Sequence, residues 1–306
     1  MHYLMTSEDL QTLITLSEIP VTDASPVRTA RINSGPTTAR LALERVGLVR
    51  DGRLSDIGRA VVSALVAPER VVTTMNTALN DIAPVSYCFR DGGWTVYAPD
   101  AQGRLASIFS PIRQREIAAF ARANLLHGTP IPPYTVPISL ALTIREAMLF
   151  QLTQQVVARR ATGLGRPLQR TEQWFAAADL FEGESLFQLA AAVEVLPEPE
   201  QQDRIRSSLA EASLLVQALQ SLVEKGVLLS HGTPTGPVYT HSSQARTWLL
   251  ADLVRDRIVV HSVLPPLEPQ YYRVTAGGIL SVRQFGESIC FQSAPDFGLE
   301  ALFSTV

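Results

Sequence analysis

The sequence is poor in residues that mark several common functional classes. Only 2 of its 306 residues are cysteine, Cys88 and Cys290, and they lie too far apart in the chain to form a zinc motif or a disulfide framework of neighbouring cysteines. Lys225 is the only lysine among the 26 basic residues, which we attribute to coding bias. No stretch approaches the ~18–20 consecutive apolar residues of a membrane-spanning helix. The first residues also lack the basic and apolar regions of a signal peptide, so we expect a cytoplasmic protein.

An excess of positive charge is also missing. The 26 basic residues are balanced by 29 acidic ones, and the net charge is −3. Most of the affinity of a nucleic-acid-binding protein comes from basic contacts to phosphates, so this balance disfavours a specific nucleic-acid partner, and equally an anionic membrane. Hydrophobic residues make up 46% of the chain, which is ample for a buried core and excludes disorder throughout.

Patterns typical of catalytic and metal sites are absent as well. The segment 163–165 is Gly-Leu-Gly, but it follows a helical pattern and lacks the third glycine of a dinucleotide-binding loop. His231 and His241 bracket a turn-rich segment and can meet across a hairpin, yet no carboxylate or cysteine lies nearby at ligand spacing. Cys88 and Cys290 fall in strand patterns and are expected to be buried small hydrophobes rather than reactive thiols. We therefore predict no catalysis, no cofactor and no metal.

The patterns in the first part of the chain predict helices followed by a set of strands. Capping residues and apolar spacing predict helices near 7–18, 37–47 and 55–67, the last capped by Ser55. β-Branched and alternating patterns predict strands at 70–75, 85–90, 94–97 and 105–109. Ser110-Pro111 is then expected to open a helix.

The second part begins with a long helical region. Helices are predicted at 139–161, 171–181, 186–193 and from about 197 to 223, with a break at 163–167. A short helix capped by Ser242 and strands near 257–260, 270–274, 279–282 and 288–291 follow, and Ala294-Pro295 stands where Ser110-Pro111 stood. The order of capped helix, strand, Gly-Gly hairpin and proline-led segment thus occurs twice.

This repetition predicts the fold class. We expect an α+β protein made of a pseudo-twofold duplicated unit, with an antiparallel central sheet flanked by helical bundles. The two copies are 1–135 and 136–306, the second with a helical insertion at 138–224, packed as one body. The alternative is a pair of independent winged-helix domains, which predicts a tandem winged-helix transcriptional regulator that contacts phosphates through Arg50, Arg53 and Arg59. Asp51 and Asp56 lie among these arginines and weaken that alternative.

The order of elements also resembles the EspG family, the cytosolic chaperones of type VII (ESX) secretion systems. The resemblance rests on the segments 43–49, 67–72, 85–90, 94–97 and 105–109, and on their counterparts from Gly226 onward and from 257 to 291. It implies the pseudo-twofold fold, no catalysis, and a helical secreted protein as client. In that family a loop between sheet strands helps to grip the client, whereas the corresponding connection here is only a tight turn.

The candidate partner-binding site is that turn with its flanking residues, Arg90, Asp91, Gly92, Gly93 and Trp94. Tryptophan is enriched among residues that dominate binding energy at interfaces. The alternative for Trp94 is a place on the buried face of its strand. The sequence identifies neither the client nor the oligomeric state.

Overall fold

The computed structural model describes residues 1–27, 36–77, 83–126, 137–181, 212–249, 256–275, 277–295 and 297–304. Helices and a large antiparallel sheet of ten strands confirm the α+β class. Contacts between residues divide the chain into two compact units. Unit 1 contains Met1–Pro130, Asp256–Gln270 and Asp296–Val306, and unit 2 contains Ile131–Arg255 and Tyr271–Pro295. These units differ from the predicted halves 1–135 and 136–306, because 256–270 and 296–306 group with the first unit.

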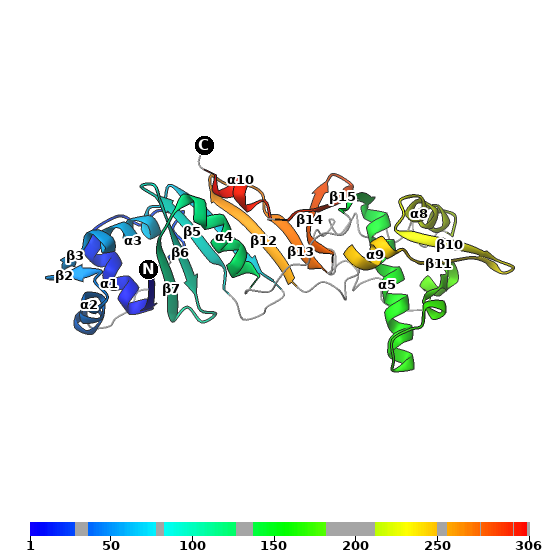
Figure 1. Cartoon of the computed structure of the whole chain (residues 1–306), viewed down its shortest axis with the longest axis horizontal. Helices are drawn as coiled ribbons and strands as arrows, with labels where there is room; N and C mark the ends of the chain where they lie inside the picture. Colours follow the sequence, from blue (N-terminus) through cyan, green and yellow to red (C-terminus); the bar gives the residue numbers. More distant parts are fainter. Residues whose placement is uncertain are drawn as a thin grey trace. The chain divides into compact units, whose positions relative to one another are not determined.

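Six strands of the large sheet belong to unit 1, in the order β1-β7-β6-β5-β4-β12, all antiparallel (Figure 1). Alternation sends Cys88 to one face and its neighbour Tyr87 to the other. The bounds are β1 (His2–Thr6), β4 (Arg70–Asn76), β5 (Val85–Arg90), β6 (Gly93–Pro99), β7 (Leu105–Ile112) and β12 (Asp256–Leu264).

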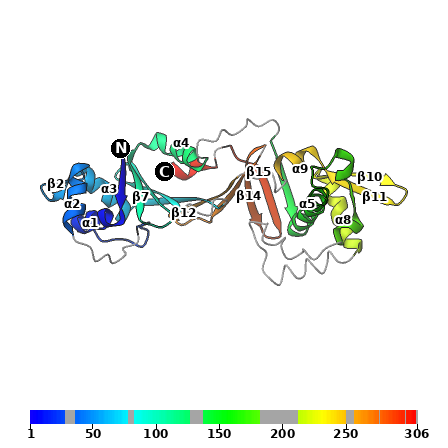
Figure 2. The same ribbon diagram turned by 90° about the horizontal axis from the view of Figure 1, so that it is seen from below.

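Helices cover both faces of this sheet. One buried cluster joins Cys88 and Ile108 of the sheet to the apolar stripes of α1 (Ser7–Ser17) and α3 (Asp56–Val66). Ser55 caps α3 as predicted, since its hydroxyl accepts the Gly58 N–H at 3.0 Å. On the other face α4 (Gln114–Leu125) and α10 (Leu299–Phe303) lie side by side (Figure 2). The remaining elements of unit 1 are α2 (Pro36–Arg45), β2 (Val49–Arg50) and β3 (Arg53–Leu54).

Unit 2 holds four strands of the large sheet in the order β13-β14-β15-β8, again antiparallel. A second sheet has the order β10-β11-β9. The strand bounds are β8 (Ser139–Thr143), β9 (Phe175–Ala176), β10 (Leu228–Thr233), β11 (Gly236–His241), β13 (Gln270–Thr275, its first residue in unit 1), β14 (Gly278–Phe285) and β15 (Ser288–Ser293).

The helices of unit 2 share one large buried core with strands of both of its sheets. The longest described helix is α5 (Ile144–Leu164), which contacts α8 (Ala212–Glu224) through Leu149 and Leu219 among others. The short helix α9 (Ser243–Trp248) contributes Ala245 and Trp248 to the same core. Two 3-10 turns, η1 (Arg170–Gln173) and η2 (Ala177–Phe181), flank β9.

The element order can be compared between the two parts of the chain. From β1 to α4 the order is β1-α1-α2-β2-β3-α3-β4-β5-β6-β7-α4. From β8 to α10, apart from η1, β9 and η2, the described elements run β8-α5-α8-β10-β11-α9-β12-β13-β14-β15-α10. Strand and helix thus alternate in the same way in both parts, while the duplication itself stays a prediction.

Two predicted helix starts are wrong. The segment 139–161 is not one helix: Ser139–Thr143 forms β8, and α5 begins after it. The sequence Ser-Leu-Ala-Leu-Thr alternates and pairs with β15, and the capping box of Thr143 and Glu146 then starts the helix. Likewise Ser110-Pro111 stays within β7, and α4 begins at Gln114, because Ile112 still pairs with Trp94 and is buried.

Other helix predictions are replaced by strand pairing or fall outside the described residues. Phe175 and Ala176, predicted within a helix at 171–181, pair with β11 instead, and Phe175 is buried there. The predicted helix at 186–193 lies outside the described residues, as does the part of the next helix that precedes α8. None of the described helices combines the length and hydrophobicity that crossing a bilayer requires.

Candidate functional site

The turn predicted to bind a partner is a two-residue hairpin between β5 and β6. Asp91 and Gly92 have φ values of 49° and 77°, the left-handed pair of a type I′ turn, which matches the twist of the strands. Arg90 is half-buried and donates to the Ala67 carbonyl, while its ion pair with the exposed Asp91 spans 3.5 Å. The tip therefore presents one acidic side chain and two glycines, with little surface for a partner.

Trp94 does not belong to this exposed tip. Its side chain is 0% exposed, and Nε1 donates to Gln114 Oε1 at 2.6 Å. Its ring meets Phe303 edge-on, with the centroids 5.0 Å apart. The prediction of Trp94 as a surface anchor is therefore corrected: alternation along β6 turns it toward α4 and α10, where it fills the core of unit 1.

The two histidines considered for a metal do not meet. His231 lies opposite Val238 in the β10–β11 hairpin and is exposed, whereas His241 lies opposite Leu228 and is buried. Thr153 Oγ1 donates to the Phe150 carbonyl, so the contact of 2.8 Å between this hydroxyl and His241 Nε2 is an N–H donated by the imidazole. Among the described residues no group of three or more His, Cys, Asp or Glu side chains is placed to hold a metal.

The two cysteines are unpaired and lie in different units. Cys88 is 0% exposed, and burial raises the pKa of its thiol to about 12. The thiolate needed for nucleophilic chemistry is therefore not formed at neutral pH. Its place in the core confirms the prediction of a buried small hydrophobe, whereas Cys290 is only half-buried.

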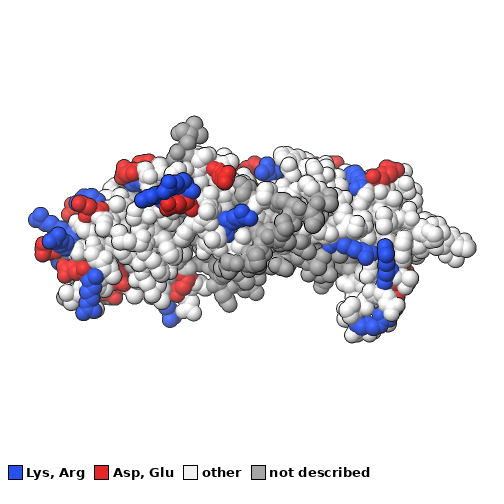
Figure 3. Space-filling view, in the orientation of Figure 1, with Lys and Arg blue, Asp and Glu red and all other residues white. Residues whose placement is uncertain are grey.

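The capped second helix of the winged-helix alternative, α3, is largely buried. Seven of the eleven residues of α3 are buried, including all of 61–66. Arg50, Arg53 and Arg59 are exposed, but so are Asp51 and Asp56 beside them. On the face drawn in Figure 3 acidic and basic side chains are interspersed over the helices of unit 1 rather than gathered in a basic stripe.

A cleft in unit 2 is the strongest candidate site in the described part of the chain. Its enclosed volume is only about 20 Å³, and it opens to solvent on one side. One wall is the face of the sheet that looks toward α5. Across this face the apolar partners Tyr271, Val282, Phe291 and Leu140 lie opposite one another on β13, β14, β15 and β8. Arg273 lies two positions after Tyr271 on β13, so it shares this face.

The second wall is a stripe of α5. Ala147, Phe150, Gln151 and Gln154 follow the spacing i, i+3, i+4, i+7, which places them on one side of a helix, and all four line the cleft. Ala147 and Phe150, nearer the start of the helix, are apolar and buried. Gln151 and Gln154, which follow, carry half-buried amides.

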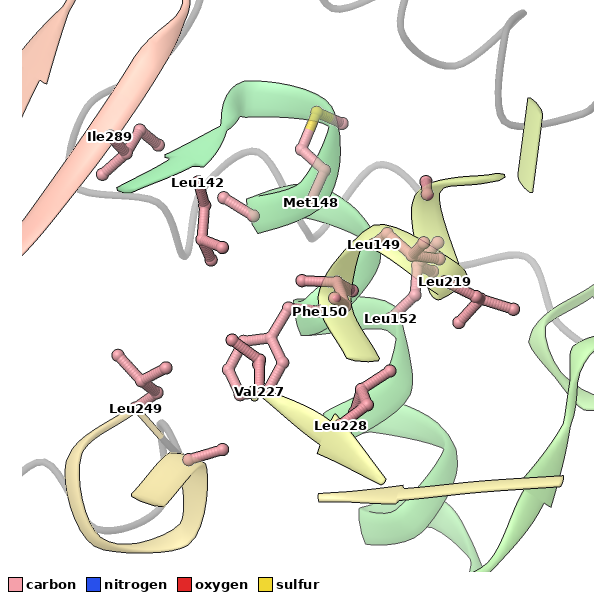
Figure 4. Close-up of a cluster of buried hydrophobic side chains, with 14 of the residues drawn as sticks. Leu142, Met148, Leu149, Phe150, Leu152, Leu219, Val227, Leu228, Leu249 and Ile289 are labelled. Carbon is pink, nitrogen blue, oxygen red and sulfur yellow. The ribbon is translucent and has the colours of Figure 1, made fainter. Parts of the chain in front are cut away.

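Leu249, at the end of α9, closes the third side. Gln154 Nε2 donates to the Leu249 carbonyl at 3.5 Å, which ties α5 to α9 beside the cleft. Figure 4 shows Leu142, Phe150 and Leu249 approaching from β8, α5 and α9 respectively. Leu142 and Leu249 are 1% and 3% exposed, so the floor of the cleft is apolar and well packed.

Only three of the described residues that line the cleft are polar: Gln151, Gln154 and Arg273. Arg273 is 7% exposed, and its guanidinium carbon lies 6.0 Å from the centre of the Phe291 ring. Gln151 Oε1 is buried and has no hydrogen-bond partner within the described structure. An apolar cleft with a small number of placed polar groups is the usual make-up of a binding site. None of the described lining residues is a Ser, Cys, His, Lys, Asp or Glu, so the cleft offers no nucleophile or general base.

Sequence reasoning missed this cleft. The spacing of Ala147, Phe150, Gln151 and Gln154 and the single arginine in the apolar strand Gln-Tyr-Tyr-Arg-Val-Thr were the available signals. The chain matches no protein-family model, and no curated protein matches it.

Proposed function

We propose that the protein is a non-catalytic, cytoplasmic binding protein that holds a helical protein client, as the resemblance to type VII secretion chaperones implies. The observation that carries the proposal is the cleft of unit 2, with its apolar walls, its two amides and its guanidinium. A client helix that presents apolar side chains at i, i+3 and i+4 fits such a surface, because these side chains pack against the apolar residues around the mouth of the cleft and the helix backbone stays outside.

The chemistry of the cleft supports binding rather than catalysis. The described lining residues provide hydrogen-bond donors and acceptors but no group that takes up or gives a proton near neutral pH. The charge distribution and the burial of α3 favour a protein partner over DNA. The shared element order of the two parts of the chain supports the proposal that the fold arose by duplication of one α+β unit.

The proposal is tested by filling the cleft. Gln154→Trp places a bulky side chain at its mouth, and Arg159→Trp places the same side chain on the exposed side of the same helix as the control. The tagged wild type, expressed in its own host, is expected to co-purify with a helical protein in near-equal amount. Gln154→Trp loses this protein and Arg159→Trp retains it.

The captured protein is then produced in a second host with and without the chain. The proposal expects it to be soluble only with the wild type or the Arg159→Trp variant. If no protein co-purifies in comparable amount, or if the Gln154→Trp variant holds and solubilises it equally well, the proposal is wrong. Circular dichroism of both variants establishes that they remain folded.

A further inference from the structure

The strand β1 is the end strand of the sheet in unit 1, and its outer edge is open. The Met1 carbonyl accepts a hydrogen bond from β7, and the Ser7 N–H donates to the residue that precedes β7. Hydrogen-bonded residues alternate along an antiparallel pair, so the odd-numbered residues of β1 face β7, while His2 and Leu4 direct their N–H and C=O groups outward. Within the described structure no strand pairs with these outward groups.

The side chains of β1 do nothing to discourage pairing at this edge. Leu4 is 65% exposed. The strand contains no charged residue and no proline, and its register with β7 runs without a bulge. Natural proteins usually protect an open strand edge with one of these features. The end strand of the sheet in unit 2, β8, differs in that its exposed positions are small or polar: Ser139, Ala141 and Thr143.

The start of α1 limits how far a partner strand can pair along β1. Thr6 is the next residue whose N–H points outward, and this N–H donates to Asp9 Oδ2 at 2.9 Å. The carbonyl of an N-cap residue such as Thr6 accepts the first hydrogen bond of its helix. The edge therefore offers four backbone groups, two on His2 and two on Leu4. A longer foreign strand finds nothing further to pair with beyond Leu4, whereas a second β1 matches this set group for group.

We propose that β1 pairs with β1 of a second copy of this chain, antiparallel and about a twofold axis. His2 of each copy then lies opposite Leu4 of the other, and these two pairs use all four backbone groups of each strand. Tyr3 lies at the axis with its side chain on the buried face. Leu4 packs beside the imidazole of the other copy's His2, which stacks on Phe109 with the ring centroids 4.4 Å apart. The dimer is closed, because both open edges are used in it.

The charges around β1 allow two copies to approach. The nearest acidic residues, Glu8 and Asp9, lie beyond the paired stretch and at opposite ends of it in the two copies, so like charges do not face each other. Because the paired stretch is short, the contact belongs with the small, reversible interfaces below about 1,200 Å². We therefore expect a dissociation constant of about 10–100 µM. This inference goes beyond the proposed function, since it concerns unit 1 and does not involve the cleft of unit 2.

Sedimentation velocity of the full chain, with its purification tag at the C-terminal end, tests the association between about 5 and 500 µM. We expect the mean mass to rise from that of the monomer toward that of the dimer. Leu4→Glu brings two carboxylates to diagonal positions of the pair and is expected to weaken the dimer at least about tenfold. Leu229→Glu is the matched control, because this leucine is 49% exposed on β10, the end strand of the second sheet, and it should leave the association unchanged.

Amide hydrogen exchange, followed by NMR, identifies the strand that pairs. At low concentration the Leu4 amide should exchange fast and the Tyr3 amide slowly, because only the second is bonded to β7. At about 500 µM the Leu4 amide should exchange about fivefold more slowly, in step with the fraction of dimer. This measurement uses the wild type alone, so it decides the question even if Leu4→Glu fails to fold.

Three results overturn the inference. The first is a monomer mass at every concentration. The second is a dimer in which the Leu4 amide stays unprotected or which Leu4→Glu forms as well as the wild type. The third is protection of the Leu4 amide that appears only when a client is added, which assigns the edge to a strand of the client and leaves the proposed function standing.

Discussion

His241 is buried between Phe150 and Phe175 at the base of the unit 2 core. Burial, and to a smaller degree the positive charge of Arg246, lower the pKa of its imidazole to about 4 from the ordinary 6.5. The unfolded chain therefore binds this proton between pH 6.5 and about 4, and the folded protein does not. Stability due to His241 is present above pH 6.5 and is lost as the pH falls toward 4.

We predict that the free energy of opening of the β10–β11 hairpin falls by about 3 kcal/mol over this pH range. Native-state hydrogen exchange of the β11 amides measures it. His241→Gln should remove most of the pH dependence, and His231→Gln, which changes an exposed imidazole on the same hairpin, should leave it intact. A slope that is the same in both variants would contradict the prediction.

Glu146 is the buried carboxylate that joins α5 to α8. Its oxygens accept from Lys225 Nζ at 2.6 Å and from the Ser221 hydroxyl at 2.5 Å, and its backbone belongs to the capping box with Thr143. Burial alone would raise the pKa of this carboxyl, but the hydrogen bonds from Lys225, Ser221 and Thr143 outweigh it and lower the pKa. The group is therefore charged in the folded protein.

Glu146→Gln should destabilise unit 2 by about 2 kcal/mol, because it leaves the Lys225 ammonium without its carboxylate in a partly buried place. Glu224→Gln changes an exposed carboxylate next to Lys225 in sequence and should leave stability unchanged. Urea unfolding of both variants measures the difference. Equal losses in the two would show that general charge, rather than this contact, is responsible.

For single residues, the sequence predicted whether a side chain is buried better than it predicted what that side chain contacts. The strand pattern around Cys88 identified a buried thiol, and one of the two alternatives for Trp94, the buried face, is the one observed. The partner of Arg273 and the neighbours of His241 come from elements far apart in the chain, so their positions depend on tertiary packing that no local pattern contains.

The short helix α10 contributes one buried aromatic ring, Phe303, to the core of unit 1. Phe303 is 1% exposed and meets Trp94 and Tyr87 edge-on, with centroid distances of 5.0 and 5.3 Å. Gln114 and Arg70 donate to the carbonyls of Phe303 and Ser304 at the end of the helix. A helix of five residues is too short to be stable alone, so these contacts hold it in place.

Phe303→Ala is expected to destabilise unit 1 by about 3 kcal/mol, since it removes a buried aromatic ring and leaves a cavity beside Trp94. Phe285→Ala is the matched control, because that ring is 62% exposed at the β14–β15 turn. Thermal unfolding, together with hydrogen exchange of the β5 and β6 amides, measures the loss of stability in the two variants. Unchanged protection of these strands in Phe303→Ala would contradict the packing role of α10.

Elements with a local signal were predicted well, and those fixed by distant pairing were not. The caps Ser55 and Ser242 marked α3 and α9, and alternation marked β5. The strand β8 was missed because its five residues also suit a helix, and only pairing with β15 decides between the two. The cleft could not be predicted because its walls come from β8, α5, α9, β13 and β15 together.

For the whole molecule, the alternative function of DNA binding makes a measurable prediction. A net charge of −3 and the mixed charges around α3 provide too few phosphate contacts for specific binding. We predict no saturable shift of DNA from the promoter of its own gene in a gel or anisotropy assay. A shift that weakens steeply between about 50 and 200 mM salt, and that disappears when Arg53 and Arg59 are replaced, would favour the regulator instead.

Unit 1 is discontinuous in the chain, and this has a consequence for synthesis on the ribosome. Residues 1–130 emerge first, but β12 and α10, which complete the unit, follow only after the whole of 131–255 and more have been made. Until then the β4 edge has no β12 to pair with, and Trp94 and Tyr87 have no Phe303 to cover them. The nascent chain therefore carries an open strand edge and an uncovered aromatic face through most of its translation, and it is during this period that the protein is most exposed to aggregation and to proteases.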